Sequence, residues 1–251
     1  MRSTTALTAL HTRFLVTETL RVPIAVIGTM LFPALALVFF VVPQSGVADD
    51  QGAATAAAAQ LSLFAVVSVC LFSFGAGVAE DRATPWDPYV RTLPAGVAPR
   101  VLGRLLNGVV FALLGLAPVV LLAAVLTAAT LTPLQALAGL LALLAASVPF
   151  LAIGLAVGYA LPVKAAVPVA QVVLFPMAFA GGLFVPPEVF PSWLDGISRA
   201  LPSRAGRDLV VAAVGGGGVG WVSVAVLAGW GVAMVALAAW AYRRDEGRRF
   251  R

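Results

Sequence analysis

Long runs of apolar residues, separated by short polar intervals, dominate the 251-residue sequence. A helix needs about 20 apolar residues to cross the hydrocarbon core of a membrane. By this criterion the pattern predicts an all-α integral membrane protein with six transmembrane helices, at residues 24–43, 55–79, 105–129, 134–161, 165–185 and 221–242. The first run is too long for the core of a signal peptide and no small-residue cleavage site follows it, so we expect it to be retained.

Four further segments complete a single transmembrane domain over residues 1–251. They are residues 1–22, 80–104, 186–220 and 243–251. In the first of them, Leu7, Leu10 and Phe14 recur at helical spacing. This spacing favours an amphipathic helix at the membrane interface over a disordered basic tail.

The composition agrees with a lipid environment, because 61% of the residues are hydrophobic and only 11% are charged, whereas a soluble domain has about 25% charged residues. Thirteen of the sixteen Lys and Arg residues fall in the segments that share a side with the two termini, and only Arg199, Arg204 and Arg207 fall on the other. The positive-inside rule therefore predicts that both termini are cytoplasmic. It also explains the net charge of +5 without a nucleic-acid partner.

The sequence contains no motif for ATP hydrolysis or metal binding. Nothing matches the phosphate-binding loop G-x-x-x-x-G-K-[ST], and His11 and Cys70 are the only histidine and cysteine. We therefore expect no enzymatic activity, catalytic residue, cofactor or metal site on this chain. The predicted spans have no charged residue at their centres, which argues against an ion-driven carrier. Gly154 and Gly158 are interpreted as packing positions between helices of one chain.

The interval between the second and third spans begins with three charged residues, Glu80, Asp81 and Arg82. A short helix with one apolar, aromatic face is expected to follow. That face would consist of Trp86, Tyr89, Val90 and Leu93. Such a helix is suited to docking into a groove of a soluble partner, but a solvated loop with an interfacial tryptophan is the other interpretation, and the pattern leaves both open.

The interval between the fifth and sixth spans has Trp193, Ile197 and Leu201 at helical spacing after Pro191. We expect two short helices here, separated at Pro202, because proline ends one helix and starts the next. They would lie at the outer leaflet or dip into it. In that position they would either line an exit path or cap the bundle.

From Phe175 onward the sequence reads FPMAFAGGLFVPPEVFPSWLDGISRALPSRAGRDLV. This stretch resembles a signature of the membrane subunits of ABC-2 type exporters, and it is most similar to the drug- and antibiotic-exporter branch. An interfacial helix before six spans, and a short helix after the second span, are also similar to that family. The stretch 83–88 departs from the pattern that is commoner in the family's coupling loop.

The resemblance implies two groups of functional residues. Those that couple the chain to an ATPase would be Glu80, Asp81, Arg82, Trp86, Asp87, Tyr89, Arg91 and Leu93. Those of an exit segment would be Phe184, Pro187, Glu188, Pro191 and Trp193.

The resemblance further implies a permease subunit of an ATP-driven exporter in a bacterial cytoplasmic (inner) membrane. Two copies of an ABC ATPase would carry ATP and Mg, and a second permease subunit, identical or paralogous, would complete the pathway within the membrane lipid. An amphipathic small molecule, drug, natural product or lipid-like substrate would move outward, as in antibiotic resistance. Two alternatives remain open: a membrane-embedded enzyme that processes lipid, with Glu80–Arg82 and Asp87 as its polar cluster, and an assembly or regulatory subunit without transport.

Overall fold

The computed structural model describes residues 4–21, 23–85, 89 and 98–249, and within these ranges the chain forms helices and no strand. In chain order the elements are α1 (Thr4–Leu20), α2 (Pro23–Phe40), α3 (Ser45–Ala48), α4 (Gln51–Leu71), the π-helix η1 (Phe72–Ala76), α5 (Gly77–Ala83), α7 (Ala98–Leu126), α8 (Pro133–Ala160), α9 (Val163–Ala180), the 3-10 helix η2 (Pro187–Val189), α10 (Ser192–Ser198), α11 (Pro202–Gly215) and α12 (Trp221–Arg249). The prediction of an all-α fold is confirmed for the described part of the chain.

Five helical stretches are long and apolar enough to cross a membrane, and they coincide with the predicted second to sixth spans. They are Gln51–Ala83, Ala98–Leu126, Pro133–Ala160, Val163–Ala180 and Trp221–Glu246. The predicted first span falls on α2, whose stretch Met30–Phe40 is apolar but shorter. The helices are those of a multi-pass membrane protein, and a sixth crossing by α2 stays a prediction.

Two of the spanning helices begin earlier than the sequence suggested, for local reasons. α4 begins at Gln51 because the Asp50 carboxylate accepts a hydrogen bond of 2.7 Å from the Ala53 backbone N–H, which caps the first turn. α7 begins at Ala98 with Pro99 in its first turn, where proline needs no hydrogen-bond partner for its nitrogen.

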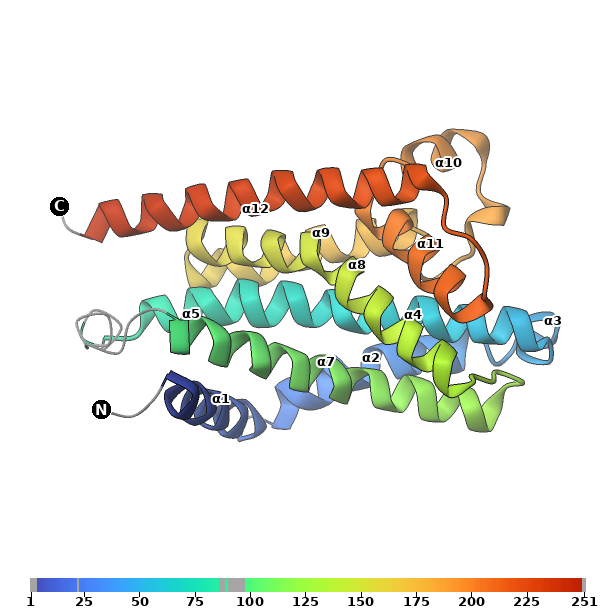
Figure 1. Ribbon diagram of the computed structural model, residues 1–251, viewed down its shortest axis with the longest axis horizontal. Coiled ribbons are helices and arrows are strands. Elements are labelled where there is room, and N and C mark those ends of the chain that lie inside the picture. The colour runs from blue at the N-terminus through green and yellow to red at the C-terminus, as the bar shows by residue number, and fades with distance from the viewer. Residues whose placement is uncertain (1–3, 22, 86–88, 90–97, 250–251) are drawn as a thin grey trace.

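The helix α4 occupies the centre of the bundle, and α2, α7, α8 and α11 pack around it (Figure 1). The approach of α8 is close enough to require glycine. A Cβ added to Gly154 would lie 2.3 Å from the Cys70 carbonyl oxygen, and one added to Gly158 would lie 2.7 Å from that of Phe74. The two glycines therefore serve helix packing within this chain.

The helix α1 packs against α7 at a second close contact. A Cβ added to Gly103 would lie 2.7 Å from Cβ of His11, and the Thr12 hydroxyl donates to the Gly103 carbonyl oxygen at 3.5 Å. Thr8 is the buried residue of α1, whereas Phe14 is exposed. The predicted N-terminal helix forms, but it meets the bundle through its threonine face and leaves its aromatic side chain outside.

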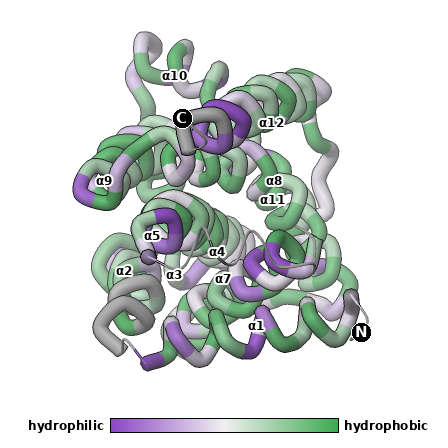
Figure 2. The backbone as a smooth tube through the Cα atoms, turned by 90° about the vertical axis from the view of Figure 1, so that its left-hand side faces the viewer, coloured by the Kyte–Doolittle hydropathy of each residue, from purple (hydrophilic) through white to green (hydrophobic). Residues whose placement is uncertain are grey.

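Both termini lie at the same end of the bundle, which we call the terminal end (Figure 1). The opposite end, which we call the distal end, holds α3 and α10 together with the start of α12. Figure 2 looks at the terminal end and shows hydrophilic residues on α1, α5 and the last turns of α12. This arrangement matches the charge asymmetry of the sequence, because a polar collar at one end of apolar helices is expected at a membrane surface.

Candidate functional site

Arg82, in the last turn of α5, connects three helices at the terminal end. Its Nη1 donates hydrogen bonds to the carbonyl oxygens of Gly158 (2.6 Å) and Leu161 (3.2 Å) at the end of α8. Its Nη2 forms an ion pair with Asp245 of α12. The last carbonyl groups of a helix lack intrahelical donors and carry partial negative charge, so a guanidinium stabilises them. Arg82 thus joins α5 directly to α8 and α12.

Asp81 and Arg104 join α5 to α7 at the same end. The two side chains form an ion pair, and Arg104 Nη1 also donates to the Ser73 carbonyl oxygen at 3.4 Å. Asp81 and Glu80 are both exposed. Of the three charged residues that the sequence placed together, Asp81 and Arg82 make contacts between helices.

The remaining predicted coupling residues fall mostly outside the described part of the chain. Trp86, Asp87, Arg91 and Leu93 lie outside the described residues, and Tyr89 is helical with 68% of its surface exposed. The docking face therefore stays a prediction. What the structure defines is α5, the helix that leads into this segment.

The helix α12 continues through Arg249, beyond the predicted end of its span at residue 242. The Tyr242 hydroxyl donates to Glu246 at 2.6 Å, and Asp245 is paired with Arg82. Such contacts sustain a helix after its apolar run has ended. The segment expected as a tail is thus helical through Arg249 and takes part in the polar contacts of the terminal end.

At the distal end, the chain reverses immediately after α9. Gly182 has a φ of 78°, a conformation that favours glycine. The turn returns Phe184 to the bundle, where its ring centroid lies 4.7 Å from those of Phe64 on α4 and Phe179 on α9. Phe184 is 8% exposed, so this predicted exit residue is a core anchor of the segment rather than part of an open surface.

The other predicted exit residues differ in their exposure. Pro187 is buried, whereas Glu188 and Pro191 are exposed, and Trp193 on α10 is 66% exposed. Two short helices were expected here, with a break at Pro202, and α10 and α11 have this arrangement. An exposed tryptophan at the end of a bundle of apolar helices suits the boundary between lipid and water.

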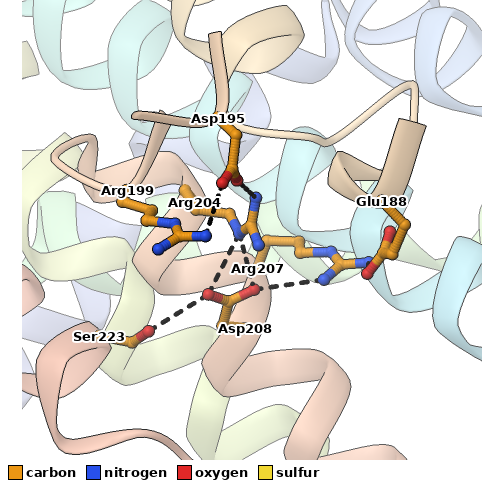
Figure 3. A network of polar contacts seen from close by, with 7 residues as sticks. All are labelled: Glu188, Asp195, Arg199, Arg204, Arg207, Asp208 and Ser223. Carbon is orange, nitrogen blue, oxygen red and sulfur yellow. Dashed lines mark hydrogen bonds and ion pairs between the residues drawn. The ribbon is translucent and has the colours of Figure 1, made fainter. Parts of the chain in front are cut away.

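A network of charged side chains links the segment after α9 to α11 and α12 (Figure 3). Arg204 contacts Asp208 at 3.1 Å and Asp195 at 3.5 Å. Arg199 pairs with the same Asp195 at 2.6 Å. The Ser223 hydroxyl at the start of α12 donates to Asp208 at 3.2 Å. Asp195 and Asp208 therefore each receive more than one donor, which holds α10, α11 and α12 together.

Arg207 is the buried member of this network, with 8% of its surface exposed. It contacts Asp208 at 3.2 Å and Glu188 at 3.4 Å. With the Gln60 amide oriented so that its oxygen faces the guanidinium, that oxygen accepts from Arg207 Nε at 3.0 Å and Nη2 at 2.8 Å. Gln60 lies on the central helix α4 and is buried. A full positive charge thus reaches the core of the bundle and is paired there, as buried charges require.

The buried pairing of Arg207 was missed by the sequence analysis, which counted this residue only as an outer cation. One signal could have pointed to it. Gln60 interrupts an otherwise apolar span, where a polar side chain usually has a partner. The partner itself could not be chosen, because Gln60 and Arg207 are far apart in the sequence.

Five acidic residues at the two ends are paired with arginine, namely Asp81, Glu188, Asp195, Asp208 and Asp245. Within the described ranges, no three His, Cys, Asp or Glu side chains come together in a way that could hold a metal ion.

Apolar spanning helices with their polar contacts concentrated at two ends define a multi-pass membrane protein. Residues 7–214 match the family described as "ABC-2 type transporter", and because the match covers most of the chain, the protein belongs to that family. It is also 23% identical over 222 residues to "Putative transport permease YvfS" of Bacillus subtilis (strain 168), a similarity that covers 88% of this chain and 91% of that protein. The chain is therefore a membrane permease component, which works with an ABC ATPase and is not itself the ATPase.

Proposed function

We propose that this chain is the permease subunit of an ATP-driven exporter that moves an amphipathic small molecule out of the cell. The observation that carries the proposal is the family match over residues 7–214 on a chain whose spanning helices are predominantly apolar. Apolar walls with few polar groups suit a drug, natural product or lipid-like substrate that partitions into the membrane. We place the protein in the bacterial inner membrane, with six crossings and both termini in the cytoplasm.

In this proposal the terminal end receives force from the ATPase. Residues 80–104 would dock on the ATPase through Glu80 and the apolar face near Trp86. Because Asp81 is bound to α7, and Arg82 to α8 and α12, a displacement of α5 would act on three spanning helices at once. Because the helices are rigid and bonded directly to one another, a small displacement at one end can rearrange the bundle.

The distal end would then release the substrate to the outside. Glu188 and Trp193 are exposed there, while Phe184 and Arg207 anchor the same segment to α4. The part of the segment that holds Glu188 and Trp193 is exposed, so it can exchange one arrangement for another at lower free-energy cost than the buried α11. The Glu188–Arg207 contact, at 3.4 Å, is the one that we expect to change between closed and open forms.

We further propose that two permease subunits and two ATPase subunits form the working complex, with ATP and Mg bound only on the ATPase. Native mass spectrometry of the purified complex tests this stoichiometry. A mass for two copies of this chain with two ATPases supports a homodimer, and one copy with a paralogous permease identifies a heterodimer.

Transport itself is tested with the chain co-purified with its ABC ATPase and reconstituted into lipid vesicles. We expect an amphipathic fluorescent dye to accumulate in inside-out vesicles only when ATP and Mg are added, and not when the phosphate-binding lysine of the ATPase is replaced. Dye accumulation without ATP would overturn the proposal.

Two other results would favour the alternative functions. A complex that hydrolyses ATP but moves none of a panel of dyes and lipids would identify an assembly or regulatory subunit. Conversion of a lipid by this chain without the ATPase would identify a membrane enzyme, with Glu80 as the first residue to substitute.

A further inference from the structure

A cavity of about 130 Å³ lies at the terminal end, between the end of α5, the end of α8 and the last turns of α12. It is lined by Arg82, Tyr159, Trp240, Arg244 and Asp245. Two guanidinium groups, two aromatic rings and one carboxylate thus surround a small space at the level where apolar helices give way to polar residues. The proposed transport cycle uses the Arg82–Asp245 contact in the wall of this cavity, but it assigns no role to Tyr159, Trp240 or Arg244.

The two arginines of the cavity differ in their pairing. Arg82 is paired with Asp245 and also donates to two carbonyl oxygens of α8, so its charge is largely compensated. Arg244 lies over the Trp240 ring, with Cζ 5.2 Å from the ring centroid, and within the described part of the chain it makes no ion pair. A guanidinium stacked on a ring still has N–H groups in its own plane for an acceptor. The cavity therefore has one positive charge that is available to an anion.

The outer face of α12 places three side chains in a particular order along the helix. Leu237 and Trp240 are exposed and three residues apart, and Arg244 follows one turn later on the same side. The order is apolar, then aromatic, then cationic, from the membrane toward the terminal end. A phospholipid has the same order: acyl chain, glycerol region and charged headgroup.

We propose that this cavity binds the phosphate of an anionic phospholipid headgroup, with Arg244 as the charged ligand and with Trp240 and Leu237 beside the glycerol and acyl chain. Basic pockets between membrane helices at a polar interface recognise lipid headgroups in this way. The inference does not depend on transport, on its direction or on the ATPase.

Arg243 provides a matched control, because it is the neighbouring arginine on α12, is exposed and does not line the cavity. The variants Arg244→Gln and Arg243→Gln lose the same charge from adjacent positions. Both side chains are exposed, so neither substitution is expected to prevent folding, and equal melting temperatures without added lipid verify this.

The test uses detergent-solubilised protein titrated with phosphatidylglycerol or phosphatidylcholine and followed by native mass spectrometry. We expect the first phosphatidylglycerol to bind more tightly than phosphatidylcholine, and Arg244→Gln to weaken it about fivefold, the loss expected for one cation near an anionic lipid. Arg243→Gln should change the affinity less than about twofold. Equal effects of the two variants, or equal binding of the two lipids, would overturn the proposal.

A second arm distinguishes a lipid from a free phosphate. Glycerol 3-phosphate and inorganic phosphate are added as competitors at the concentration of the lipid. We expect neither to displace phosphatidylglycerol, because both lack the acyl chain that contacts α12. Displacement at equal concentration would show an anion site without lipid specificity and would contradict the assignment.

Discussion

At the scale of single residues, Arg207 and Arg199 belong to the same polar network but differ in their surroundings. Arg207 is buried between Glu188, Asp208 and Gln60, whereas the side chain of Arg199 is 71% exposed and contacts Asp195. Removal of a buried hydrogen-bonded side chain costs more than removal of an exposed one, because water cannot replace the missing contacts of the groups that remain. The two arginines therefore allow a direct measurement of what burial contributes here.

We predict that Arg207→Leu lowers the free energy of unfolding by about 2 kcal/mol, since it leaves the buried Gln60 oxygen without a donor and removes one contact of Asp208. Arg199→Gln, the control from the same network, should cost less than about 1 kcal/mol. Denaturant titration of the two purified variants in mild detergent measures both values. Similar losses for the two variants would show that the burial of Arg207 has no energetic role.

At the scale of helices, the contact of α8 with α4 and η1 depends on the absence of side chains. Gly154 leaves no room for a Cβ next to the Cys70 carbonyl oxygen. Gly229, in the middle of α12, has no atom within 4 Å of an added Cβ. The chain thus offers a helical glycine that packing requires and one that it does not.

We predict that Gly154→Ala destabilises the protein by about 2 kcal/mol, because the two helices must move apart to admit the methyl group. Gly229→Ala should be neutral or stabilise by up to about 1 kcal/mol, since alanine favours the helical backbone. Thermal unfolding in detergent, followed by circular dichroism, compares the two. A neutral Gly154→Ala would contradict the close packing of α8 on α4.

The helices themselves could be predicted from the sequence because an apolar run of sufficient length is a local signal. The contacts between them could not. Gln60 and Arg207, or Arg82 and Asp245, are far apart along the chain, and no local pattern pairs them. For the same reason the packing of Phe184, a residue of the predicted exit segment, against Phe64 could not be predicted. The coupling residues Trp86, Asp87, Arg91 and Leu93 lie outside the described residues, so their role stays a prediction.

At the scale of the whole molecule, the two termini share one end, and the charged residues of α5 and α12 lie there with them. An even number of crossings requires this arrangement, and α2 decides the number, because five other helical stretches are long and apolar enough to span. The orientation is a separate question, namely which of the two ends faces the cytoplasm.

Single cysteines test both points in a Cys70→Ala background, with substitutions Ala9→Cys on α1, Gly217→Cys at the distal end and Arg243→Cys on α12. We predict that a membrane-impermeant maleimide added to intact cells labels only the position at Gly217. The other two should react only after the membrane is opened. Labelling of Ala9→Cys but not of Arg243→Cys from outside would show that α2 does not cross, and the reverse of the predicted pattern would invert the orientation.

The ion pair between Arg82 and Asp245 has a consequence for the biogenesis of the protein. Arg82 lies at the end of the first of the five helical stretches that are long and apolar enough to span, whereas Asp245 is on the last of them to leave the ribosome. The helices α4, α5 and α8 are therefore synthesised before Asp245, and until α12 follows, Arg82 lies near the lipid surface without this carboxylate. Insertion of α12 forms the ion pair. A chain that ends before Asp245 keeps its other spans but lacks this contact, so the terminal end reaches its final structure only when the last helix is in place.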